Sequence, residues 1–199
     1  MYFLLPLLFP SLTWNIRQKE KILYLTFDDG PVPEVTPWVL HELSKYNARA
    51  TFFCIGDNVR KHPEIYQQII ASGHLTGNHT QHHLSGWNVK HDIYIQDVEA
   101  AAVFIKSSLF RPPYGRITPS IIKRLKSTYK IIMWDVLSYD FDVTRTAEYC
   151  AKKVIGSAHK GSIIVFHDSI KAEPRLKRAL PDVLKHFHEQ GYRFEALSI

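Results

Sequence analysis

Cysteine is scarce in this chain, and no apolar stretch is long enough to cross a membrane. Only Cys54 and Cys150 occur among its 199 residues, which excludes both a disulfide framework and a cysteine-rich metal site. Cys54 lies within the apolar segment ATFFCIG and is expected to be a small core residue. The two cysteines therefore leave the cellular compartment open.

The N-terminal stretch MYFLLPLLFPSLTW is apolar but has only about half the length of a membrane span. It lacks the basic start and the small-residue cleavage site of a secretory signal, and Pro6 and Pro10 interrupt it. It is either an atypical uncleaved targeting segment or an extended stretch packed on the domain that residues 20–199 form. We expect residues 1–19 to be packed, with localisation open between the cytoplasm and the cell envelope.

Acidic residues are outnumbered, with 19 Asp and Glu against 25 Lys and Arg, for a net charge of +6. An anionic partner is therefore conceivable. The basic residues are nevertheless scattered at helix-like spacing, as solvated helix faces require, and no nucleic-acid-binding signature occurs. Internal repeats and low-complexity tracts are absent too. We expect one domain with no nucleic-acid partner, while the oligomeric state is not determined.

Strand-like and helix-like patterns alternate along the chain, which predicts a parallel sheet covered by helices. Both a closed barrel of fewer than eight units and an open doubly wound sheet fit this pattern. The expected strands are 21–27, 50–56, 74–79, 109–110, 129–136, 161–167 and 192–197. The expected helices are 35–46, 59–72, 91–107, 118–127, 144–158 and 175–190.

Polar residues follow the expected strands at their carboxyl ends. These residues are Asp28 and Asp29, His79 and His83, Arg111 to Gly115, Asp135 to Asp140, and His167 and Asp168. The carboxyl ends of parallel strands share one edge, where α/β proteins bind their ligands. We therefore expect these side chains to meet in one site.

His79 and His83 are four residues apart, so a tight loop can turn both imidazoles toward one point. With one carboxylate of the Asp28–Asp29 pair they form a two-histidine, one-aspartate set that leaves coordination positions open. A cation there neutralises one carboxylate and lets the other remain nearby as a base. His82 is the alternative ligand to His83.

The RPPYG segment and His167 complete the expected site. Two prolines stiffen the backbone around Arg111, and Gly115 permits an unusual backbone angle. His167 ends a strongly apolar strand and suits a general acid, because imidazole titrates near neutral pH.

Four motifs in this order resemble the polysaccharide deacetylase family, the NodB-homology domain of carbohydrate esterase family four. They are TFDDG (26–30), HTQHH (79–83), RPPYG (111–115) and VFH (165–167), and the resemblance spans residues 20–197. It implies a distorted (β/α)7-like barrel that deacetylates an N-acetylated sugar with a divalent metal, zinc foremost and cobalt or nickel as alternatives.

The resemblance also implies the role of each site residue. Asp29, His79 and His83 correspond to the metal ligands and Asp28 to the base, an assignment that the residues alone leave open. His167 corresponds to the acid. Arg111 orients Asp28, and the backbone N–H of Tyr114 donates to the oxyanion. Phe141 and Val165 are the expected substrate contacts.

The fourth motif departs from the family pattern Asp-x-x-Asp-Trp, because residues 137–141 read LSYDF. The resemblance implies that the first aspartate, replaced by Leu137, pairs with the catalytic histidine, and that Phe141 takes the place of the tryptophan. Asp135 or Asp140 could then support His167.

Three functions remain at this stage. The first is N-deacetylation of a polymer or oligomer containing N-acetylglucosamine, such as peptidoglycan or chitin. The second is the same chemistry on acetylated xylan or a small amide. The third is non-catalytic carbohydrate binding.

Overall fold

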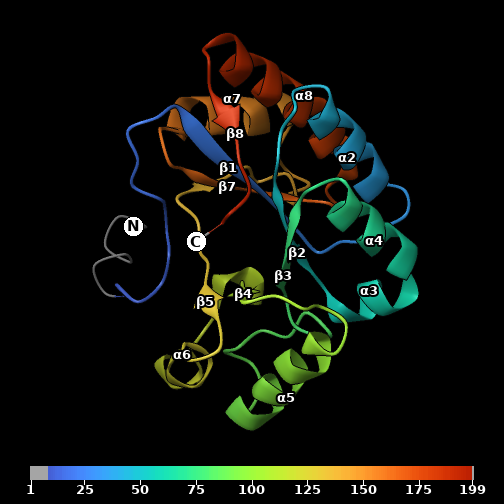
Figure 1. Ribbon diagram of the computed structural model, residues 1–199, viewed down its shortest axis with the longest axis vertical. Coiled ribbons are helices and arrows are strands. Elements are labelled where there is room, and N and C mark those ends of the chain that lie inside the picture. The colour runs from blue at the N-terminus through green and yellow to red at the C-terminus, as the bar shows by residue number, and fades with distance from the viewer. Residues whose placement is uncertain (1–8, 199) are drawn as a thin grey trace.

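The computed structural model describes residues 9–198. Seven strands form a curled sheet in the order β5–β4–β3–β2–β1–β7–β6, every neighbouring pair is parallel, and β8 pairs with β1 (Figure 1). This confirms the expected distorted (β/α)7-like barrel in a single domain. The strands are β1 (Ile22–Asp28), β2 (Thr51–Cys54), β3 (Leu75–Asn78), β4 (Leu109–Phe110), β5 (Lys130–Ile131), β6 (Val136–Leu137), β7 (Ile163–His167) and β8 (Arg193–Phe194).

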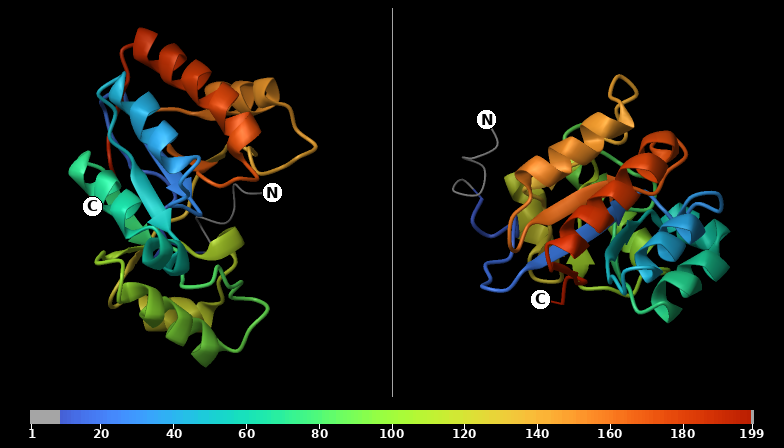
Figure 2. Two further views of the ribbon diagram at one scale, coloured as in Figure 1. Left: turned by 90° about the vertical axis from the view of Figure 1, so that its right-hand side faces the viewer. Right: turned by 90° about the horizontal axis from the view of Figure 1, so that it is seen from above.

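Helices cover the outside of the sheet. They are α2 (Thr36–Ser44), α3 (Gly56–Lys61), α4 (Pro63–Ala71), α5 (His91–Ala102), α6 (Pro119–Leu125), α7 (Ala147–Ser157) and α8 (Glu173–Glu189), with a short 3₁₀ turn, η2 (Pro113–Gly115). Helices α7 and α8 lie together at one end of the molecule, and α5 and α6 lie at the other (Figures 1 and 2). None of the described helices has the length and apolar character needed to cross a membrane.

Apolar residues on alternate sides of the strands explain this layering. Leu23, Leu25 and Phe27 of β1 point outward and pack with the apolar stripe of α8, where Leu176, Leu180 and Val183 are buried. A second cluster joins α5 and α6 to the β4–β5 edge. Thr26 and Asp28 alternate with the outward residues of β1, so the sequence pattern itself directs them toward the interior of the barrel.

The N-terminal stretch contacts the curled sheet at two places, beside the margin strand β5 and at the start of β7. Thr13 bridges Ile132, just after β5, and Asn15 bridges Ser162, just before β7. Leu12 and Trp14 are buried against the α5–α6 cluster. The expected packing of residues 1–19 thus lies partly outside the described residues, which begin at position 9.

Two of the expected elements are each divided into two in the structure. The helix expected at 59–72 is two helices that meet at His62, because Pro63 lacks an N–H and disfavours a helical conformation in the residue before it. The strand expected at 129–136 is also two strands: β5 pairs with β4, and β6 pairs with β7 at the opposite margin. The apolar run 131–133 is continuous, so its periodicity could not reveal the crossing between them.

Candidate active site and metal centre

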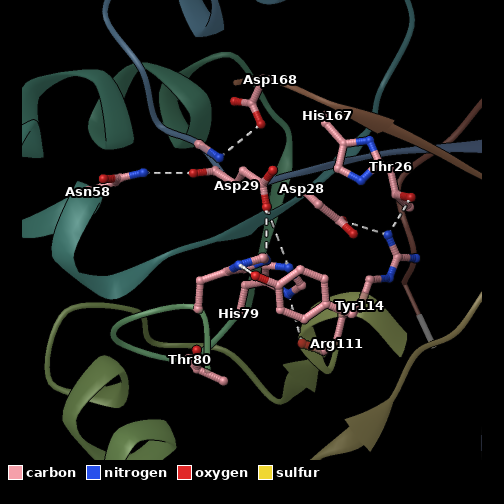
Figure 3. Close-up of polar contacts among 12 residues, drawn as sticks. Thr26, Asp28, Asp29, Asn58, His79, Thr80, Arg111, Tyr114, His167 and Asp168 are labelled. Carbon is pink, nitrogen blue, oxygen red and sulfur yellow. Dashed lines mark hydrogen bonds and ion pairs between the residues drawn. The ribbon is translucent and has the colours of Figure 1, made fainter. Parts of the chain in front are cut away.

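Five strands deliver polar side chains to one edge of the barrel, the edge at the carboxyl ends of β1, β3, β4, β6 and β7. Asp28 ends β1 and His167 ends β7, and these two residues are paired in register. His79 directly follows β3, and Arg111 directly follows β4. Figure 3 shows them facing a common centre.

Asp29, His79 and His83 offer ligand atoms that all lie within 4.8 Å of one another. Asp29 Oδ1 is 3.2 Å from His83 Nε2 and 3.8 Å from His79 Nε2. This oxygen is buried and has no hydrogen-bond partner among the described residues. An unpartnered buried carboxylate oxygen is costly, so the three groups fit a divalent cation well.

The other ring nitrogens of the two histidines are already engaged. His79 donates its Nδ1–H to the carbonyl oxygen of Arg111 at 2.8 Å, which leaves a lone pair on Nε2. His83 Nδ1 lies 3.1 Å from the hydroxyl of Tyr114, an exposed side chain that sequence analysis singled out only for its backbone. Both Nε2 atoms are thereby directed at Asp29.

Electrostatics favour the protonation states that metal binding needs. Burial lowers the pKa of His79 to about 4, so the imidazole is neutral near pH 7. Burial alone would raise the pKa of Asp29, but the neighbouring His83, His167 and His79 outweigh it and hold that pKa below its ordinary value. A neutral imidazole and an ionised carboxylate are the forms that bind metals.

The structure turns His83, and not His82, toward Asp29. Asp97 of α5 is buried and accepts hydrogen bonds from the backbone N–H groups of Gln81 and His82, and its Oδ1 is 2.6 Å from His82 Nδ1. His82 is thereby held away from the centre, while His83 continues the loop with a left-handed φ of 58°. Asp97 is the anchor that sequence analysis missed.

Asp28 forms a buried ion pair with Arg111, whose side chain is fully enclosed. Arg111 Nη1 donates to Asp28 Oδ1 and to Thr26 Oγ1, both at 2.7 Å. Its other nitrogens donate to the carbonyl oxygens of Ile132 and Met133, and its guanidinium carbon lies 4.1 Å from the centre of the Phe53 ring. Arg111 is held from several directions and in turn fixes the Asp28 carboxylate.

Asp140 is the residue that contacts His167. Its Oδ1 lies 2.7 Å from His167 Nδ1, and its Oδ2 accepts the backbone N–H of His167 at 2.8 Å. Of the two expected supports of His167, Asp135 and Asp140, Asp140 is therefore the one in contact with it. Tyr139 has a left-handed φ of 63° in the turn that precedes Asp140.

Asp135 does not belong to this site, which corrects the alternative support of His167. It lies at the start of β6, where Oδ1 accepts the backbone N–H of Ile163 at 2.8 Å and Oδ2 accepts Ser162 Oγ at 2.9 Å. Those partners stand at the beginning of β7, the end opposite His167. The split of the expected strand 129–136 explains this displacement.

The Asp140 contact determines the protonation of His167. Burial lowers the pKa of His167, but Asp140 and, more weakly, Asp29 and Asp28 raise it to about 9. A protonated His167 is therefore kept until the pH rises through about 9. In Asp140→Asn this support is lost, so we expect the alkaline limb of the kcat/KM profile to move to lower pH. Turnover rates measured from pH 6 to 10 test this, and an unchanged alkaline limb would remove Asp140 from that role.

The two expected substrate contacts lie beside His167. The ring centre of Phe141 is 5.0 Å from that of His167. Val165 is buried, and because side chains alternate along β7 it lies on the same side of the strand as His167. Phe141 is partly exposed, so only this ring is open to a ligand.

Asp168 holds the turn that carries Asp29, a function that sequence analysis did not assign. Its buried carboxylate accepts the N–H of Gly30 at 3.1 Å and the hydroxyl of Thr36 at 2.6 Å. A Cβ on Gly30 would lie 2.0 Å from Asp168 Oδ2, so glycine is required there. Asp29 itself has a φ of 85°, and its carbonyl accepts Asn58 Nδ2 at 2.7 Å.

A two-histidine, one-aspartate centre at the carboxyl edge of an α/β barrel, with a carboxylate and an imidazole beside it, defines a metal-dependent hydrolase. Comparison with known proteins agrees. The sequence profile described as polysaccharide deacetylase matches residues 15–129. A peptidoglycan-N-acetylglucosamine deacetylase of Bacillus cereus is 35% identical over 94% of this chain and 91% of its own length.

Two further relatives extend the comparison. The peptidoglycan-N-acetylmuramic acid deacetylase PdaC of Bacillus subtilis is 31% identical over 92% of this chain, which spans only 39% of that protein. A crystal structure of a peptidoglycan N-acetylglucosamine deacetylase in complex with 4-naphthalen-1-yl-N-oxidanyl-benzamide has a TM-score of 0.85 at 29% identity. That likeness covers 94% of this chain and 91% of the other. The chain therefore belongs to the polysaccharide deacetylase family, carbohydrate esterase family four, and is a hydrolase that deacetylates a polysaccharide or oligosaccharide.

Proposed function

We propose that this enzyme removes the acetyl group from N-acetylglucosamine in the glycan strands of peptidoglycan, with zinc as its metal. The observation that carries the proposal is the convergence of Asp29, His79 and His83 beside both Asp28 and His167. The similarity to peptidoglycan deacetylases over nearly the whole chain supports the substrate.

Asp29, His79 and His83 would hold the ion. Two imidazoles and one carboxylate suit zinc and leave positions open for water and substrate, as a catalytic site needs; cobalt and nickel accept the same donors. When bound, a divalent cation polarises the acetyl carbonyl and lowers the pKa of a water molecule.

The chain's own residues then move the protons. Asp28, fixed by Arg111, takes a proton from the attacking water as the new C–O bond forms. The backbone N–H of Tyr114 donates to the oxyanion, and its left-handed φ of 60° sets the direction of the adjoining peptides. His167 gives its proton to the amide nitrogen as the C–N bond breaks, so that acetate and a free amine leave. The partly exposed Phe141 ring forms the wall against the acetyl methyl, while Val165 is buried.

An acetate-release assay tests this proposal. We expect the zinc-loaded enzyme to release acetate from peptidoglycan fragments and from N-acetylglucosamine oligomers, to stop after dialysis against a chelator, and to recover when zinc is added back. Acetylated xylan and small amides are assayed in parallel, because hydrolysis of their ester or amide bonds is the competing function. Activity that survives complete metal removal would contradict the role of the metal. Acetate release from acetylated xylan alone would show that xylan, and not peptidoglycan, is the substrate.

A further inference from the structure

An exposed arginine lies between two exposed aromatic rings on the wall of the site. The guanidinium carbon of Arg116 is 5.3 Å from the centre of the Trp87 ring and 5.7 Å from the centre of the Tyr114 ring. Trp87 is 63% exposed and Tyr114 is 61% exposed. We call these three residues the Trp87–Arg116–Tyr114 ladder.

Two loops are joined beneath the ladder. The N–H of Gly86 donates to the carbonyl of Arg116 at 3.2 Å, and Trp87 Nε1 donates to the carbonyl of Ile117 at 3.4 Å. A Cβ on Gly86 would lie 2.7 Å from the Arg116 oxygen, so the close approach depends on glycine. The ladder is thus a fixed feature of the wall.

The charge of Arg116 is not neutralised by the protein. Within residues 9–198 its guanidinium forms no ion pair, whereas Arg60, Arg124 and Arg145 each pair with an aspartate. Stacking between aromatic rings fixes the plane of a guanidinium while leaving its N–H donors free. Such a planar fork matches the two oxygens of a carboxylate.

The ladder also adjoins the proposed metal ligands. The Tyr114 ring centre is 4.6 Å from that of His83, and the Tyr114 hydroxyl is 3.1 Å from His83 Nδ1. If one sugar of a glycan lies at Asp28 and His167, the next sugar would therefore lie along this wall. The exposed indole of Trp87 offers a flat apolar surface to such a sugar ring.

We propose that Arg116 binds a carboxylate carried by the glycan next to the sugar that is deacetylated, so that the ladder selects anionic peptidoglycan over neutral chitin. This inference rests on the proposed function. In peptidoglycan the carboxylate has two sources: the lactyl group of N-acetylmuramic acid in strands without peptides, and the acidic groups of the peptide where it is attached.

Steady-state kinetics of the zinc-loaded wild type and Arg116→Gln test the ladder on three substrates. These are a neutral N-acetylglucosamine tetramer, peptide-free peptidoglycan fragments and peptide-bearing fragments. For the anionic substrates we expect KM to rise about 5–20-fold in Arg116→Gln, with kcat nearly unchanged, because an exposed charged pair contributes to binding and not to bond breaking. The KM for the tetramer should not change. A rise with peptide-free fragments identifies the lactyl carboxylate, and a rise only with peptide-bearing fragments identifies the peptide.

Arg124→Gln is the matched control, because it removes the same charge from an exposed arginine that is already paired with Asp92 at 2.6 Å. If the peptide-free fragments show the rise in KM, amidation of their lactyl carboxylate should weaken wild-type binding as much as Arg116→Gln does. Equal KM changes for neutral and anionic substrates, or none at all, would overturn the inference. Equilibrium binding of the same fragments to Asp28→Asn, with and without Arg116→Gln, measures the contribution of Arg116 to affinity in the absence of turnover. A lack of acetate release would therefore count against the proposed function alone, while the binding difference would still decide the role of Arg116.

Discussion

Asp28→Asn is expected to lower kcat by about 10²–10⁴-fold, the range that a general base contributes. Asparagine has nearly the same shape, and its Oδ1 can still accept the hydrogen bond from Arg111 that now measures 2.7 Å. It cannot take a proton from water. The measurement is acetate release under saturating substrate, with the zinc content of each preparation determined in parallel.

The zinc content shows whether activity is lost because the base is missing or because the metal is no longer bound. Asp29, His79 and His83 supply the expected ligands, so Asp28→Asn should bind zinc as the wild type does. Asp92→Asn is the control, because this carboxylate is exposed and pairs only with a surface arginine, Arg124, among the described residues. More than a tenth of wild-type activity in zinc-loaded Asp28→Asn would contradict the role of base. Loss of zinc together with activity would make Asp28 a ligand instead.

The sequence predicted the site mainly because β1 is unambiguous. Seven consecutive buried residues run into Asp28, and alternation along the strand directs Thr26 and Asp28 inward. Since parallel strands share a carboxyl edge, the positions of His79, Arg111 and His167 in the chain were enough to place them in one region. No knowledge of the loops was needed for that step.

Side chains beyond the strand ends could not be placed in this way. Alternation stops at Leu137, and the left-handed turn at Tyr139 carries Asp140 back to His167. The pattern predicts Asp135 near His167 only if β5 and β6 form one strand, and they do not. A short apolar run gives the same periodicity whether it stays in one strand or crosses between two.

The supporting contacts were beyond sequence reasoning for a related reason. Asp97 directs His82 away from the centre from a helix 15 residues further along the chain, and Asp168 fixes the Gly30 turn from 138 residues away. The sequence indicates neither that Asp97 contacts His82 nor that Asp168 contacts Gly30. Only the folded chain shows that both act on the loops that present Asp29 and His83.

These supports explain how the site keeps three carboxyl groups together in a buried place. Asp28 is neutralised by Arg111, Asp29 faces two imidazoles, and Asp168 bonds to a backbone N–H and a hydroxyl. Of these acids, Asp28 is the one paired with a buried cation, and removing Arg111 should expose the cost of the charge that it leaves behind.

Arg111→Met tests that cost most directly and is expected to lower the free energy of unfolding by about 3–5 kcal/mol, the effect of breaking a buried ion pair. Arg111 is fully buried and Asp28 is 4% exposed, so the remaining carboxylate would have no water to replace the guanidinium. The measurement is urea denaturation at pH 7 of the metal-free protein. Arg124→Met, which breaks an exposed pair, should cost less than about 1 kcal/mol.

The double variant Asp28→Asn with Arg111→Met distinguishes lost charge pairing from lost packing. If the uncompensated charge of Asp28 causes the destabilisation, the double variant should be more stable than Arg111→Met alone. If the packing of Arg111 on Phe53 and its bonds to Ile132 and Met133 dominate, the two variants should be equally unstable. Equal stability would show that Arg111 is mainly a structural residue of the barrel interior, because pairing with the Asp28 charge would then contribute little to stability.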